Sequence, residues 1–140
     1  MRYLGIDLGT KYVGLSISDS LGIIASSYKT LQFTNNEDLA LEIKALVELE
    51  KIGGVVLGLP KNMNNSIGQR ALSVQEFKVV LSNVLGIEVI FQDERLSSVE
   101  ANNYLIDRDV SRKKRKKIVD KAAASIILQT YLDTKKKERN

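Results

Sequence analysis

A carboxylate inside an apolar segment is the first feature of this sequence that could support chemistry. Asp7 interrupts the apolar run of residues 3–8, which has the pattern of a buried strand. A buried carboxylate loses several kcal/mol of hydration unless a cation or a metal ion compensates its charge. The alternative is structural, because an Asp side chain also caps tight turns, such as the one expected at Gly9 and Thr10.

Two further acidic positions could act together with Asp7. Asp93 and Glu94 follow a strand-like segment, and open α/β sheets place their ligands at such strand ends. Asp120 follows a strongly basic stretch. Both positions also have structural explanations. Glu94 could form an ion pair with Arg95 on a surface loop, and Asp120 could stabilise the first turn of a helix through the helix dipole.

The three carboxylates form a site if the strand that carries Asp7 lies at the centre of the sheet. Glu94 would then follow a neighbouring strand, and Asp120 would begin a helix over the same sheet edge. Converging carboxylates raise one another's pKa unless divalent cations lie between them. All-oxygen ligands fit Mg²⁺ or Mn²⁺, so we expect one of these ions as the cofactor.

The absence of histidine and cysteine narrows the chemistry further. With neither residue among its 140, the chain has no disulfide, no thiolate nucleophile, no histidine general base and no Ser-His-Asp triad. A zinc site built from thiolates or imidazoles is excluded as well. A two-metal site held by carboxylates can hydrolyse a phosphodiester without histidine, so the missing residue is no objection to such a reaction.

The hydrophobic pattern predicts an α/β fold with a mixed five-stranded sheet flanked by helices. The predicted strands cover residues 3–8, 13–18, 22–33, 55–59 and 87–91. The predicted helices cover residues 37–51, 71–84, 97–106 and 118–131. We expect glycines at 53–54 and Gly86 to end the first two helices, and residues 135–140 to form a solvated tail. Three antiparallel strands followed by right-handed crossovers place the first strand at the centre.

A basic segment suggests an anionic partner. Residues 108–117 contain seven cations and one anion, which predicts a mobile loop. The whole chain has a net charge of +4 and a pI near 9.3. A solvated loop without a partner is the alternative. The cations expected to contact phosphates are Arg112, Lys113, Lys114, Arg115, Lys116 and Lys117.

Four segments resemble the signature blocks of the YqgF family, in the same order along the chain. They are residues 5–11 (GIDLGTK), 58–63 (GLPKNM), 93–101 (DERLSSVEA) and 111–120 (SRKKRKKIVD). The similarity covers essentially the whole chain and implies a single ribonuclease H-like domain over residues 1–140, related to Holliday junction resolvases. It also implies a bacterial nuclease that matures the 5′ end of pre-16S ribosomal RNA.

The same resemblance assigns roles to particular residues. Asp7, Glu94 and Asp120 match the acidic triad of the family, as catalytic residues and metal ligands. The chain departs from the usual pattern at Asn64, where many members have Asp, and at Lys121, next to Asp120. Outside the basic segment, the residues expected to contact nucleic acid are Lys11, Asn62 and Arg95.

Other functions compete with a nuclease of structured RNA. Four-way DNA is the alternative substrate, and a non-catalytic RNA-binding assembly factor is the alternative class. A sugar kinase or actin-like ATPase also carries a Gly-x-Asp-x-Gly-Thr hairpin, but such enzymes close two domains around the nucleotide and this chain has the length of one. We expect a cytoplasmic protein that binds no membrane, is a monomer or homodimer and meets pre-16S ribosomal RNA or ribosomal particles.

Overall fold

Five strands form one mixed sheet with the N-terminal strand at its centre. The computed structural model describes residues 1–60, 68–93 and 112–139, with the backbone alone for 112–121 and 137–139. The strands are β1 (Tyr3–Leu8), β2 (Tyr12–Ser18), β3 (Ala25–Gln32), β4 (Gly54–Leu59) and β5 (Val89–Asp93). The helices are α1 (Asn36–Leu49), α2 (Gln69–Leu85) and α4 (Arg112–Arg139). The order is β3-β2-β1-β4-β5, with β1 antiparallel to β2 and parallel to β4, so the predicted topology is confirmed.

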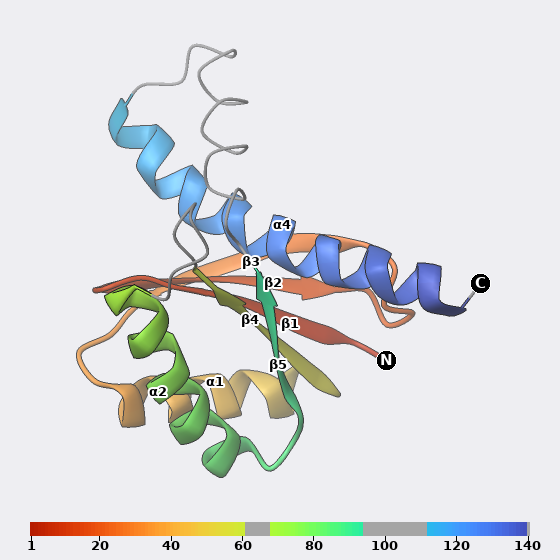
Figure 1. Ribbon diagram of the computed structural model, residues 1–140, viewed down its shortest axis with the longest axis horizontal. Coiled ribbons are helices and arrows are strands. Elements are labelled where there is room, and N and C mark those ends of the chain that lie inside the picture. Colours follow the sequence, from red (N-terminus) through yellow and green to blue (C-terminus); the bar gives the residue numbers. More distant parts are fainter. Residues whose placement is uncertain (61–67, 94–111, 140) are drawn as a thin grey trace.

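The two faces of β1 contact different helices. α1 and α2 cover one face of the sheet and α4 covers the other (Figure 1). Leu4, Ile6 and Leu8 belong to the core that includes α1 and α2, whereas Tyr3 packs in the cluster with α4. Side chains alternate along a strand, so Asp7 shares the face of Tyr3. The carboxylate of Asp7 therefore belongs to the α4 side of the sheet.

Small residues let α4 lie directly on β1. A Cβ atom at Gly5 would lie 2.8 Å from Cβ of Leu128 and 3.0 Å from the carbonyl oxygen of Ala124, and would also meet Ser16 Oγ. Ser16 Oγ donates a hydrogen bond of 2.7 Å to that same carbonyl oxygen. The absent side chain at Gly5 thus determines how closely the helix approaches the central strand.

The ends of α1 and α2 are formed by different residue types. Gly86 adopts a left-handed φ of 67° and caps α2, as predicted. The prediction that the glycines at 53–54 stop α1 was wrong, because the helix ends at Leu49 and the left-handed residue is Lys51, with φ 55°. Gly54 is required by packing instead, since a Cβ there would lie 2.8 Å from the Tyr3 ring.

The basic segment that was predicted as a loop is helical from Arg112 onward. α4 spans 28 residues, whereas the predicted helix covered 118–131. Residues 112–139 contain no Gly or Pro, and Lys and Arg favour helices, while each repulsive pair costs only about 0.2–0.5 kcal/mol. Residues 135–139 of the predicted tail continue the same helix, and Lys135 contacts Tyr3 of β1. Residues 108–111 and the predicted helix at 97–106 lie outside the described residues, and none of the described helices is long and apolar enough to cross a membrane.

Candidate functional site

Asp7 lies near the end of β1 with one carboxylate oxygen that makes no hydrogen bond. Its side chain is 10% exposed, and Oδ1 is buried without a hydrogen-bond partner among the described residues. The amide of Gly9, a donor that a turn cap would use, donates to the Tyr12 carbonyl at 2.9 Å instead. A buried acceptor without a donor is costly, and such exceptions in native proteins often belong to ion-binding or other functional sites. This oxygen is therefore available to a cation.

The nearest cation to Asp7 in the described part of the chain is Arg70, in the first turn of α2. Its Nη2 lies 3.9 Å from Asp7 Oδ1 and donates a hydrogen bond of 3.1 Å to the Leu8 carbonyl. A separation of 3.9 Å allows charge attraction but is too long for a hydrogen bond. Reasoning from the sequence missed Arg70, because no local pattern indicates that the start of α2 lies at the end of β1.

The backbone register of α4 brings residue 120 toward the same end of β1. Lys135 contacts the beginning of β1, and Ala124 lies against Gly5, so α4 runs antiparallel to the strand. Four residues back along the helix cover about 6 Å, and two residues forward along the strand cover about 6.6 Å. These two steps lead from the contact at Gly5 to residue 120 on the helix and to Asp7 on the strand.

The structural explanation proposed for Asp120 does not apply. An acidic residue stabilises a helix dipole within the first turn, but α4 begins at Arg112, so residue 120 lies in its third turn. The orientation of the Asp120 side chain lies outside what the structure describes.

Of the two acidic residues predicted beside the fifth strand, the structure describes Asp93, at the end of β5. β1 and β5 lie on either side of β4, so their backbones are about 10 Å apart. In the pairing of β4 with β5, Asp93 lies opposite Leu59. Asp93 is two residues after Phe91, so the two side chains share a face of the sheet, and Phe91 packs against the core with α1 and α2. By alternation, Asp93 belongs to the face opposite Asp7. Glu94, the residue assigned to the triad, lies outside the described residues.

The structure describes only some of the predicted nucleic-acid contacts. Lys11 is exposed in the turn that follows β1, at the Asp7 end of the sheet. Residues 112–117 have a helical backbone, but their side chains are not described, and Asn62 and Arg95 lie outside the described ranges. Within 1–60, 68–93 and 122–136, no three acidic side chains gather into a group that could hold a metal ion.

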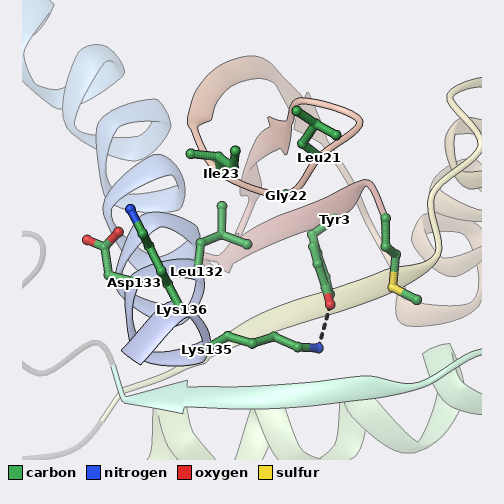
Figure 2. A pocket seen from close by; sticks show the side chains of 9 residues that line it. Tyr3, Leu21, Gly22, Ile23, Leu132, Asp133, Lys135 and Lys136 are labelled. Carbon is green, nitrogen blue, oxygen red and sulfur yellow. Dashed lines mark hydrogen bonds between the residues drawn. The ribbon is translucent and has the colours of Figure 1, made fainter. Parts of the chain in front are cut away.

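Two hollows lie at opposite ends of β1. The smaller, about 260 Å³, lies at the Asp7 end, with Arg70 in its wall. The larger, about 410 Å³, lies at the other end, between the β2–β3 turn and the C-terminal part of α4 (Figure 2). There, Lys135 Nζ donates a hydrogen bond of 2.6 Å to Tyr3 Oη, and this bond raises the pKa of Lys135. Leu21 and Ile23 make part of its rim apolar, and Asp133, Lys135 and Lys136 also line it, whereas Arg70, the partner of Asp7, lines the smaller hollow.

The topology and the carboxylate on the central strand define the class of fold. The structure is similar to Thermus thermophilus RuvC in complex with a Holliday junction substrate, with a TM-score of 0.60, 12% identity and coverage of 98% of this chain and 96% of that one. It is also similar to the fowlpox virus resolvase in complex with Holliday junction DNA, with a TM-score of 0.59, 12% identity and coverage of 96% and 98%. The fold is therefore that of the RuvC-like resolvases of the ribonuclease H class, as predicted.

Sequence similarity then identifies the family. A family model described as "RuvX: Holliday junction resolvase" matches residues 1–134. A protein of Listeria monocytogenes serotype 4b (strain CLIP80459), named "Putative pre-16S rRNA nuclease", is 48% identical over 139 residues, or 96% of this chain and 99% of that protein. A Geobacillus kaustophilus (strain HTA426) protein of the same name is 44% identical over 138 residues, or 97% and 100%. The chain belongs to the RuvX (YqgF) family, a family of nucleases.

Proposed function

We propose that this protein is a divalent-metal-dependent nuclease that hydrolyses phosphodiester bonds in structured RNA and acts in maturing the 5′ end of pre-16S ribosomal RNA. The observation that carries the proposal is the buried Oδ1 of Asp7 at the end of the central strand, which has no hydrogen-bond partner among the described residues. The names of the relatives from Listeria and Geobacillus support the RNA substrate. This role would place the protein in the cytoplasm, with ribosomal particles among its partners.

The donor set fits a hard divalent cation. Asp7 offers a carboxylate oxygen that accepts no hydrogen bond from the part of the chain that the structure describes, and β1 holds it rigidly because the strand is paired on both sides. In the proposed site, Glu94 and Asp120 supply the remaining carboxylates. When bound, Mg²⁺ or Mn²⁺ lowers the pKa of an attacking water and stabilises the leaving oxygen. The three carboxylates bind and orient, and none of them needs to act as a nucleophile.

The basic first turns of α4 would hold the substrate backbone. A helix rotates by 100° per residue, so six successive positions of a helical backbone are spread around its axis rather than along one side. About half of the residues at 112–117 can then face a nucleic acid at one time, and the salt dependence of binding should correspond to roughly three phosphate contacts rather than six. This result would distinguish a helical basic segment from the loop that the sequence predicted.

A Holliday junction resolvase is the second candidate. The description of the family model and the two junction complexes of similar fold favour it. A four-way junction has two symmetric strands to cut, so this function calls for a homodimer, whereas RNA processing is possible for a monomer. A third candidate is an RNA-binding assembly factor in which the carboxylates hold a structural ion.

One experiment separates these functions. The purified protein and its Asp7→Asn variant are incubated with a labelled pre-16S ribosomal RNA fragment and with a four-way DNA junction, in Mg²⁺, Mn²⁺ or EDTA. We expect metal-dependent cleavage of the RNA that Asp7→Asn abolishes while folding and RNA binding remain. Glu42→Gln, which neutralises an exposed carboxylate on α1, is the matched control and should leave cleavage unchanged.

The remaining outcomes are equally specific. Cleavage of the junction alone would make the protein a resolvase. Binding without cleavage in either metal would favour the assembly factor. Loss of folding in Asp7→Asn would show that Asp7 is structural, so circular dichroism of both variants accompanies the assay.

A further inference from the structure

We propose that Arg70 is a positioning residue that supplies the counter-charge of Asp7 before a divalent cation binds, and that it competes with this cation for Asp7. The inference rests on the metal-dependent nuclease proposed above. It adds a residue outside the acidic triad that sets how tightly the site binds its cation.

Arg70 is close enough to compensate the charge of Asp7, but its hydrogen bond goes to the backbone of Leu8. Arg70 Nη2 donates to the Leu8 carbonyl at 3.1 Å, and this bond anchors the guanidinium to the backbone next to Asp7. From there Nη2 lies 3.9 Å from Asp7 Oδ1, which accepts no hydrogen bond from any described residue. The pair therefore gains electrostatic attraction while the oxygen keeps its lone pairs for another ligand.

A second ion pair in the chain shows the ordinary arrangement. Arg2 Nη1 lies 3.3 Å from Glu50 Oε2 and donates a hydrogen bond to it. There the guanidinium donates a hydrogen bond directly to the carboxylate, as in a structural ion pair. The contact between Arg70 and Asp7 is longer, although the Asp7 side chain is 10% exposed and that of Glu50 is 28% exposed. The more buried carboxylate thus has the longer distance to its guanidinium partner.

Of the two side chains, Arg70 is the one that can move. Asp7 belongs to a strand that is paired on both sides, whereas the Arg70 side chain is 56% exposed and borders the 260 Å³ hollow. A long Arg side chain keeps its charge in water while its stem rests on the protein. A divalent cation at Asp7 would repel the guanidinium, and the hollow gives the guanidinium space to withdraw.

The test measures cation binding rather than activity. Mn²⁺ is titrated calorimetrically, without substrate, into the wild-type protein and the variants Arg70→Gln and Arg70→Lys. Because a like charge near the site is removed, Arg70→Gln should bind Mn²⁺ about tenfold more tightly, and Arg70→Lys, which keeps the charge, should stay within about threefold of the wild type. Arg2→Gln is the matched control for the change in net charge and should leave the affinity unchanged.

Thermal unfolding provides an independent readout. Without metal, Arg70→Gln should unfold at a lower temperature than the wild type, because a buried carboxylate has lost its counter-charge, and Mn²⁺ should raise its Tm by more than it raises that of the wild type. If Arg70→Gln does not fold, the double variant Asp7→Asn/Arg70→Gln should fold, because it contains neither charge.

Each failure has a distinct meaning. Mn²⁺ affinity that Arg70→Gln leaves unchanged or weakens would overturn the competition and make Arg70 a purely structural residue. Failure of the double variant to fold, where Arg70→Gln also fails, would overturn it as well. A wild-type protein that binds no Mn²⁺ would instead refute the proposed metal-dependent nuclease, and the competition with it.

Discussion

Replacing Gly5 by alanine should separate α4 from the central strand. The new Cβ would lie 2.8 Å from Leu128 Cβ and 3.0 Å from the Ala124 carbonyl oxygen, and would meet Ser16 Oγ. Overpacking of this kind costs about 1–3 kcal/mol, and loss of the Ser16 hydrogen bond to Ala124 adds about 1 kcal/mol. We therefore expect Gly5→Ala to lower the free energy of unfolding by about 2–4 kcal/mol.

Urea denaturation followed by circular dichroism measures this loss. Gly86→Ala is the matched control, because Gly86 has a left-handed φ of 67° but no atom within 4 Å of an added Cβ. That substitution should cost about 1 kcal/mol through the backbone alone. In the site proposed above, displacement of α4 would also move residue 120 away from Asp7, so Gly5→Ala should weaken Mn²⁺ binding, whereas Gly86→Ala should not.

A double-mutant cycle tests whether the crowding between the new Cβ and Ser16 causes this loss of stability. Ser16→Ala removes one of the atoms that the new Cβ would meet, so it should destabilise the Gly5→Ala background less than it destabilises the wild type. The reasoning is refuted if Gly5→Ala costs no more than Gly86→Ala, or if the effects of Gly5→Ala and Ser16→Ala simply add.

Three further predictions concern α4 and the β2–β3 turn. Gln129 accepts from the amide of Ala25 at 2.8 Å and donates to the Ile23 carbonyl at 2.9 Å, so Gln129→Ala should cost about 1–2 kcal/mol and increase hydrogen exchange at Ala25. Backbone hydrogen bonds from Ile24 and Ile23 lower the pKa of Asp19 below 3.8. The stability that they supply is therefore present at neutral pH and is lost as the pH falls through the lowered pKa, and in acid titrations of unfolding the deficit of Asp19→Ala should shrink only in that range. Neutralising the four cations at 113–116 should weaken RNA binding and flatten its salt dependence in filter-binding assays, and an unchanged slope would remove this segment from the interface.

The sheet was predictable because its strands have strong local patterns. The run at 3–8 and the continuous apolar strand at 55–59 indicate burial on both faces, which places them at the centre of the sheet. Gly86 ends α2 as predicted, because a left-handed cap is a local requirement. In contrast, the start of α4 at Arg112 was missed because the charge pattern at 112–117 was given more weight than the helix propensity of Lys and Arg and the absence of Gly and Pro.

The candidate site was predictable only in part, for a related reason. Asp7 is recognisable because a carboxylate is unusual in an apolar strand. Arg70 is not recognisable, because its contact with Leu8 depends on how α2 lies over the end of β1. The face of Asp93 likewise requires the pairing register with β4, which a single sequence does not specify. The assignments of Glu94 and Asp120 remain predictions.

Because α4 contacts β1 in an antiparallel direction, the number of residues between residue 120 and Ala124 determines where residue 120 lies relative to the strand in the proposed site. One residue inserted in this turn would rotate residue 120 by about 100° and shift it by about 1.5 Å relative to the strand. One residue inserted after Leu132 would leave the contact at Gly5 intact, because Ala124 and Leu128 precede it. Insertions in this helix should therefore be tolerated according to which side of the Gly5 contact they fall on, and not according to how exposed the inserted residue is.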